Sequence, residues 1–140
     1  MADERTEWNR KIIDEFRANH GKVGGPFAGA PILLLHHQGA KTGQVRVNPV
    51  AYQDLGDGRV AVFASKGGAP TNPDWYHNLV ANPDTTIEIG TETVPVTARV
   101  PDDAERAPIW DAQKKAMPGF ADYEKKTTRQ IPVVILERVA

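Results

Sequence analysis

The chain has 140 residues, with 17 basic and 18 acidic side chains and no cysteine. This length is typical of one domain with a substantial core. The near-zero net charge argues against broad nucleic-acid binding, and the absence of thiols excludes disulfides, zinc–thiolate sites, iron–sulfur clusters and a cysteine nucleophile. No apolar run approaches the roughly 20 residues of a membrane span. The charged N-terminus lacks a signal-peptide core, so a cytoplasmic protein is the default expectation.

The first predicted element is an amphipathic helix over residues 4–19, which Gly21 is suited to end. Its apolar stripe consists of Trp8, Ile12, Ile13 and Phe16. We expect this stripe to pack on the domain. A helix that lies at a membrane surface, or over a pocket, is the alternative. A glycine-rich connection then completes the first 30 residues.

Residues 31–140 predict a β-rich unit in the same single domain. Strands are expected over 32–37, 44–53, 59–65, 85–89, 94–100 and 131–136, with hairpin turns at Asp57-Gly58 and Gly90-Thr91. Helices are expected from 72 to about 81 and over about 15 residues from Asp102 or Asp103, followed by a short helical turn. This order indicates a mainly β (α+β) fold, an antiparallel barrel of about six strands whose openings are covered by helices.

One loop at a strand end has the composition of an anion site. Gly39 to Gly43 reads as a tight turn that contains Lys41, and the next strand places Arg46 and Asn48 on one face. Two cations beside turn amides suit an anion. Two solvated surface cations are the alternative.

A second loop, from Ser65 to Trp75, points the same way. Asn72 is suited to cap a helix whose first residue is Pro73, and Ser65 and Lys66 would lie beside that helix N-terminus. An ordinary capped loop is the alternative. Two independent loops of this kind favour a phosphorylated ligand.

Catalytic machinery is sparse in the sequence. His36 and His37 point to opposite faces of a strand, so they cannot easily share a metal, and such a residue more often packs than binds a ligand. Metalloprotease, nucleophile-elbow and P-loop motifs are absent, and Ser65 has no base beside it in sequence. The pattern fits an enzyme in which an organic cofactor supplies the reactive atom and the protein supplies orientation.

Five ordered blocks resemble the deazaflavin-dependent nitroreductase family. From about Leu33 to the end of the chain, the blocks are Gly39-Ala40-Lys41-Thr42-Gly43, Arg46-Val47-Asn48-Pro49, Ala64 to Ala69, Asn72 to Asn78, and Pro118 to Tyr123 with Thr127 to Pro132. Each block alone is weak, but five in order are specific. The resemblance implies a split β-barrel that binds coenzyme F420, a deazaflavin with a phosphodiester and a polyglutamate tail.

The resemblance also implies which residues hold this cofactor. The phosphate would lie at Lys41 and Arg46, in a turn lined by Ala40 and Thr42. The ring system would lie along Arg46, Val47, Asn48, Pro49, Val50 and Ala51. The opposite wall would consist of Phe63, Ala64, Ser65 and Lys66, and the helix start would add Asp74, Trp75, Tyr76, His77 and Asn78.

The implied activity is hydride transfer from the reduced cofactor to a quinone, an α,β-unsaturated carbonyl or a nitro compound. Phe120 and Tyr123 would lie on the substrate side, and Tyr123, Ser65 or water would donate the proton. Ala51 and Phe120 stand where the nitroimidazole reducers of the family carry tyrosines, which argues against nitroimidazoles as acceptors. An FMN-binding split-barrel oxidoreductase and a non-catalytic carrier of the cofactor or an apolar ligand are the alternatives. No metal is implied, and monomer and dimer both stay open.

Overall fold

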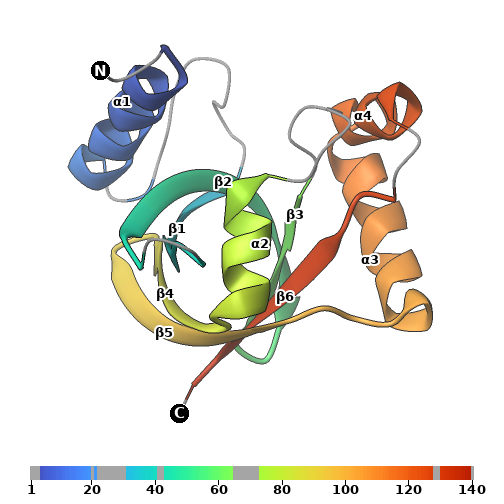
Figure 1. The fold of residues 1–140 in the computed structure, drawn as a ribbon. Helices are drawn as coiled ribbons and strands as arrows, with labels where there is room; N and C mark the ends of the chain where they lie inside the picture. The colour runs from blue at the N-terminus through green and yellow to red at the C-terminus, as the bar shows by residue number, and fades with distance from the viewer. Residues whose placement is uncertain are drawn as a thin grey trace.

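The computed structural model describes residues 4–19, 21, 31–40, 43–64, 73–127 and 130–139, without the side chains of residues 4–9. Within this part of the chain, four helices and six strands follow one another (Figure 1). Their bounds are α1 Glu4–Ala18, β1 Ile32–Gln38, β2 Val45–Gly56, β3 Arg59–Phe63, α2 Asp74–Ala81, β4 Asp84–Ile89, β5 Glu92–Arg99, α3 Asp103–Ala116, α4 Gly119–Lys126 and β6 Val133–Arg138.

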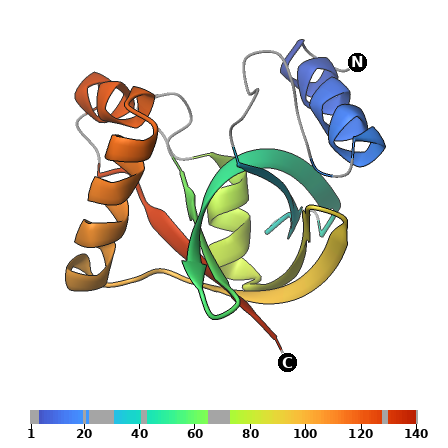
Figure 2. The same ribbon diagram turned by 180° about the vertical axis from the view of Figure 1, so that it is seen from behind.

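The six strands form a closed antiparallel barrel in the order β1-β2-β3-β6-β5-β4. The barrel closes where β1 pairs with β4, through Leu34 with Glu88 and Leu35 with Ile87. The predicted mainly β barrel is therefore confirmed. Figures 1 and 2 show α2 across one opening of the barrel, α1 outside it on one side, and α3 and α4 outside it on the other.

The barrel is filled by alternate side chains of its strands together with two residues of α2. Trp75 and Leu79 from α2 pack against this interior. The buried strand residues of the cluster include Leu33, Leu35, Val60, Val62, Ile87, Val94, Val96, Val134 and Leu136. Helix α2 is thus part of the core, which fixes where its N-terminus lies relative to β1 and β2.

The outer faces of β1, β3 and β6 are also apolar, because helices cover them. Ile12 and Phe16 of α1 pack on Ile32 and Leu34, which confirms that the predicted apolar stripe packs on the domain. The side chain of Trp8, the first residue of that stripe, lies outside the described part of the chain. Ile109, Trp110 and Phe120 of α3 and α4 cover Ala61, Phe63, Val133 and Ile135. Burial on both faces explains why these strands read as unbroken apolar runs.

Several turns and caps match the sequence prediction. Asp57 and Gly58 both have positive φ, at 54° and 75°, as a tight hairpin with matching twist requires. The side chain of Asp102 accepts a hydrogen bond from the backbone nitrogen of Glu105 at 2.9 Å and caps α3.

Several predicted boundaries were wrong. Strand β2 continues to Gly56 and not to residue 53, and β5 begins at Glu92 and not at residue 94. Pro73 is the N-cap of α2, in extended backbone, and not its first helical residue, while Asn72 lies outside the described residues. Strand β6 begins at Val133 and not at residue 131; the carbonyl of Pro132 still accepts from the nitrogen of Ala64, but proline has no N–H for the ladder. Strand β3 ends at Phe63, two residues early, where its pairing with β6 ends.

The short helical turn expected after Pro118 is a helix of eight residues, α4. Pro118 stands at its N-cap, where a missing N–H costs nothing, and its carbonyl accepts from the nitrogen of Ala121 at 3.0 Å. Phe120 and Tyr123 lie on one side of this helix, with ring centroids 5.4 Å apart, as their spacing predicts.

Candidate functional site

The first half of β2 has an open edge. Residues Ile32 to Gln38 of β1 pair with Val45 to Ala51, whereas β3 joins β2 only from Tyr52 onward. Within the described residues, the second edge of Val45 to Ala51 therefore has no strand partner. An unpaired edge presents backbone donors and acceptors in a row, and a flat heterocycle can hydrogen-bond to it as a strand would.

Side chains on this half-strand divide between two faces. Val50 packs with the barrel interior, and Arg46 and Asn48 share its parity. Val47 and Ala51 pack instead on the side that α1 covers, and Pro49 has their parity. The residues predicted to line the cofactor thus form two sets, and side chains from only one set can face a ligand on a given side of the strand.

The turn between β1 and β2 is tied to α2. The backbone nitrogen of Ala40 donates to Oδ1 of Asn78 at 3.0 Å, and the nitrogen of Gly43 donates to the carbonyl of Gly39 at 2.9 Å. Gly43 has a φ of +72°, which favours glycine. Lys41 and Thr42, predicted to line this turn, lie outside the described residues. The described end of this turn at Ala40 contacts α2, and its other end, Gly43, lies just before the start of β2.

A buried histidine joins β1, β2 and α2. His37 is 2% exposed; its Nε2 lies 2.6 Å from Oδ1 of Asn48, and its Nδ1 lies 2.9 Å from Nδ2 of Asn78. Burial lowers the pKa of His37 from its ordinary value, although the hydrogen bond to Asn48 acts in the opposite direction. The neutral form is therefore favoured.

The sequence did not identify His37 as more than a packing residue. Its two partners are 11 and 41 positions away, so no local spacing indicates the network. The adjacent His36 points the other way, as predicted, and its Nε2 lies 2.8 Å from Oε2 of Glu88.

Residues at the start of α2 divide between surface and core. Asp74 and His77 are exposed, Tyr76 is half-buried and contacts the ring of His77, and Asn78 belongs to the buried network. The side chain of Trp75 packs inside the barrel and is 7% exposed. Contact between Trp75 and a surface ligand is thus restricted mainly to its backbone.

An aromatic cluster joins the end of β3 to α3 and α4. The ring of Phe63 lies 5.9 Å from that of Trp110 and 5.6 Å from that of Phe120, and Tyr123 continues the row, half-buried. Ala64 is fully buried in the barrel interior, and Ser65 and Lys66 lie outside the described residues. The structure thus brings Phe63, Phe120 and Tyr123 together, two of them predicted on the substrate side and one on the cofactor wall.

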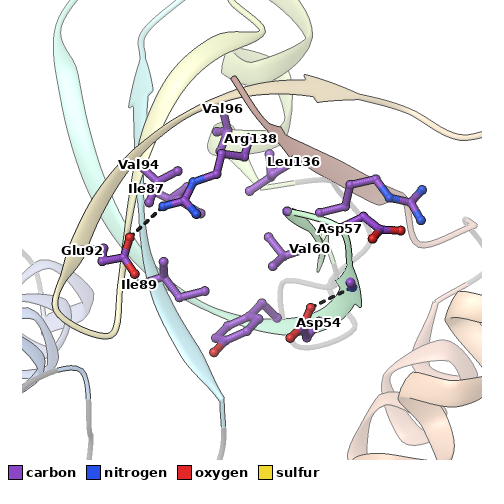
Figure 3. A pocket seen from close by; sticks show the side chains of 14 residues that line it. Asp54, Asp57, Val60, Ile87, Ile89, Glu92, Val94, Val96, Leu136 and Arg138 are labelled. Atoms are coloured by element: carbon purple, nitrogen blue, oxygen red, sulfur yellow. Dashed lines mark hydrogen bonds and ion pairs between the residues drawn. The ribbon is translucent and has the colours of Figure 1, made fainter. Parts of the chain in front are cut away.

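A separate cavity opens at the barrel end away from α2 (Figure 3). It has a volume of about 310 Å³, with Val60, Ile87, Val94 and Leu136 among its apolar walls. Glu92 and Arg138 form an ion pair of 2.7 Å at its rim. None of the residues predicted to bind the cofactor lines this cavity.

The described residues offer neither a metal site nor a membrane-spanning helix. They contain no group of three or more histidine, aspartate or glutamate side chains placed to hold a metal ion. None of the described helices is long and apolar enough to cross a membrane.

A closed antiparallel barrel with one open half-strand, a turn tied to a helix beside it and an aromatic cluster at the neighbouring strand end defines the class of split β-barrel proteins. The profile of one family, the F420H(2)-dependent quinone reductases, matches residues 8–138. The chain belongs to the F420H(2)-dependent quinone reductase family. This result confirms the deazaflavin-dependent family and the enzyme class expected from the sequence.

Two relatives whose names give F420H2 dependence agree with this assignment, and a third solved structure is similar. An F420H(2)-dependent quinone reductase of Mycobacterium tuberculosis is 42% identical over 127 residues, which cover 88% of this chain and 85% of the relative. A solved F420-H2 dependent reductase is 41% identical with a TM-score of 0.69, over 76% of this chain and 94% of that one. A solved domain-swapped dimer is 37% identical with a TM-score of 0.71, over 96% of this chain and 100% of that one.

Proposed function

We propose that this chain binds reduced coenzyme F420 along the open edge of β2 and transfers its hydride to a quinone beside the aromatic cluster. The observation that carries this proposal is the open edge of Val45 to Ala51, next to a turn that Asn78 holds in place. The identities of the cofactor and the acceptor are inferred from the family, and the geometry of β2 supports this edge as the binding site.

The donors at this edge suit the cofactor's acidic side chain. Arg46 is exposed, and it forms no ion pair with any residue in the described ranges. A guanidinium is well matched to a phosphodiester, and Lys41 in the preceding turn would add a second cation. FMN also carries a phosphate, so these cations suit both cofactors, and it is the family that favours the deazaflavin over FMN.

Reduced F420, when bound, would supply the hydride, and the protein would orient the acceptor. Phe63 and Phe120 are buried, and the half-buried ring of Tyr123 at the end of this row would contact a quinone ring. Reduction of a quinone to a hydroquinone takes up one hydride and one proton. In the hydroquinone the two added hydrogens are on the two oxygens. The hydroxyl of Tyr123 would donate a hydrogen bond to the quinone oxygen that gains charge, and water, Ser65 or Tyr123 would supply the proton.

The direct test mixes the purified protein with reduced F420 and a water-soluble naphthoquinone and follows the return of oxidised F420 absorbance. We expect many turnovers per protein, well above the rate of the same mixture without protein. Tight F420 binding without turnover would indicate a carrier. Turnover with reduced FMN and none with reduced F420 would indicate the FMN alternative.

A further inference from the structure

One buried chain of hydrogen bonds runs from the turn after β1 to the open half of β2. It contains the backbone nitrogen of Ala40 and the side chains of Asn78, His37 and Asn48, linked by contacts of 3.0, 2.9 and 2.6 Å. His37 and Asn78 are 2% and 9% exposed, so water does not replace these bonds easily.

Proton positions along this chain follow from its first member. A backbone N–H can only donate, so Oδ1 of Asn78 must face Ala40 and Nδ2 must face His37. An amide nitrogen also donates, so Nδ1 of His37 must accept. Nδ1 then carries no proton, and a neutral His37 holds its proton on Nε2.

The last member of the chain is fixed by the same logic. Nε2–H of His37 donates, so Asn48 presents Oδ1 to it and turns Nδ2 away. Nδ2 of this half-buried side chain has no acceptor among the described residues. Without His37, the two ends of the Asn48 amide would be free to exchange places.

We propose that His37 is a positioning residue that holds Asn48 with its amide nitrogen directed at the bound deazaflavin. The inference rests on the proposed function, because it takes F420 as the ligand of β2. The pyrimidine part of a deazaflavin carries carbonyl oxygens, and a fixed amide donor favours such acceptors.

The first experiment needs no cofactor. Long-range ¹H–¹⁵N spectra of the protein, with ¹⁵N-labelled histidine at neutral pH, report which ring nitrogen of His37 is protonated. We expect the neutral ring with its proton on Nε2, and we expect His37→Gln to identify the signals by their loss. A proton on Nδ1, or an imidazolium, would overturn the assignment.

The second experiment is a double-mutant cycle on F420 affinity, measured by fluorescence titration of wild type, His37→Leu, Asn48→Ala and the double variant. If His37 acts through Asn48, His37→Leu raises the dissociation constant about tenfold in the wild type but has little effect when Asn48 is already alanine. A merely structural role of His37 would weaken binding equally in both backgrounds, and that result would overturn the proposal.

His37→Gln serves as the conservative variant, because its side-chain amide can still donate to Asn48. We expect it to restore most of the affinity lost in His37→Leu, with folding of each variant checked by circular dichroism. If wild type does not bind F420, the proposed function fails, and with it the part of this inference that concerns the ligand. If wild type binds F420 but the affinity losses of His37→Leu and Asn48→Ala simply add in the double variant, this inference is overturned and the proposed function stands.

Discussion

Arg17 of α1 and Glu88 of β4 form a two-pronged ion pair, with Nη2 to Oε2 at 2.7 Å and Nε to Oε1 at 3.0 Å. His36 of β1 reaches the same carboxylate at 2.8 Å. This carboxylate is mostly buried, and its hydrogen bond from Arg17 lowers the pKa of Glu88. The contact joins α1 to two strands of the barrel at the point where β1 meets β4.

We predict that Arg17→Ala lowers the free energy of unfolding by about 1 kcal/mol, because the mostly buried carboxylate of Glu88 loses its principal partner. Arg138→Ala is the matched control. The ion pair of Arg138 with Glu92 has the same 2.7 Å distance, and Arg138 is 51% exposed against 50% for Arg17. The two pairs differ in the carboxylate, since Glu92 is 65% exposed and Glu88 only 17%. Urea unfolding should show a loss of about 0.5 kcal/mol or less for the control. Equal losses would argue against this account of α1 docking.

Gly21, which follows α1, lies in close contact with Gly90. Gly21 has a φ of +91°, and a Cβ at this position would lie 2.6 Å from Cα of Gly90 in the β4–β5 turn. We predict that Gly21→Ala costs at least about 3 kcal/mol, from backbone strain and overlap together. Gly56→Ala, at a φ of +79° with open space around it, should show only the backbone term of about 1–2 kcal/mol. Thermal or urea unfolding compares the two, and a Gly56 variant that loses as much as the Gly21 variant would contradict the contact.

The pKa of His37 makes its contribution to stability depend on pH. Burial lowers this pKa below the ordinary 6.5, so the unfolded chain binds the proton more readily than the folded one. The stabilisation is complete above about pH 6.5 and is lost as pH falls toward the folded-state pKa. Among nearby titratable groups, Arg46 and His36 lower the pKa of His37 further, and Asp74 raises it.

We therefore predict that the stability advantage of wild type over His37→Gln shrinks as pH falls from about 7.5 to 5. The other histidines are common to both proteins, so most of their effects cancel in the difference. Urea unfolding at a series of pH values measures it. An advantage that stays constant or grows toward acid pH would mean that the folded state does not disfavour a charged His37.

Tyr123 is expected to act on the acceptor. In Tyr123→Phe the ring contact with Phe120 is retained and only the hydroxyl is lost, so F420 affinity should stay the same. Oxidation of the reduced cofactor by a quinone should slow by about tenfold, since one donor to a developing oxyanion is removed where water has access. Stopped-flow absorbance measures this step. Tyr52→Phe is the control, because Tyr52 lines the cavity at the barrel end away from α2, and it should leave the rate unchanged. Equal rates in the two variants would assign Tyr123 a packing role.

The sequence predicted the barrel because its signals are local. Period-two alternation, the Asp57-Gly58 turn and the Asp102 cap each act within a few residues, and the structure contains all three. It did not predict the network of His37, Asn48 and Asn78, whose members come from three elements and meet only when α2 packs into the barrel. It also underestimated α4, since a proline reads as a break although it is well tolerated at an N-cap.

The candidate site was predicted mainly through its resemblance to a family. Composition alone indicated an anion near Lys41 and Arg46, but neither the open edge of β2 nor the burial of Trp75 follows from residue types. The edge exists because β3 leaves β2 at Tyr52, a property of the register between strands and not of either strand alone.

The most direct test of the central claim, that F420 binds at the open edge of β2, is a fluorescence titration of F420 into wild type and Arg46→Ala. Arg46 is exposed at this edge, whereas Arg59, the control, lies at the opposite end of the barrel near Glu105. Loss of a charge-assisted phosphate contact should raise the dissociation constant about tenfold or more in Arg46→Ala. Arg59→Ala should bind as wild type does. Unchanged affinity in Arg46→Ala, or an equal loss in Arg59→Ala, would contradict the placement of the cofactor at this edge.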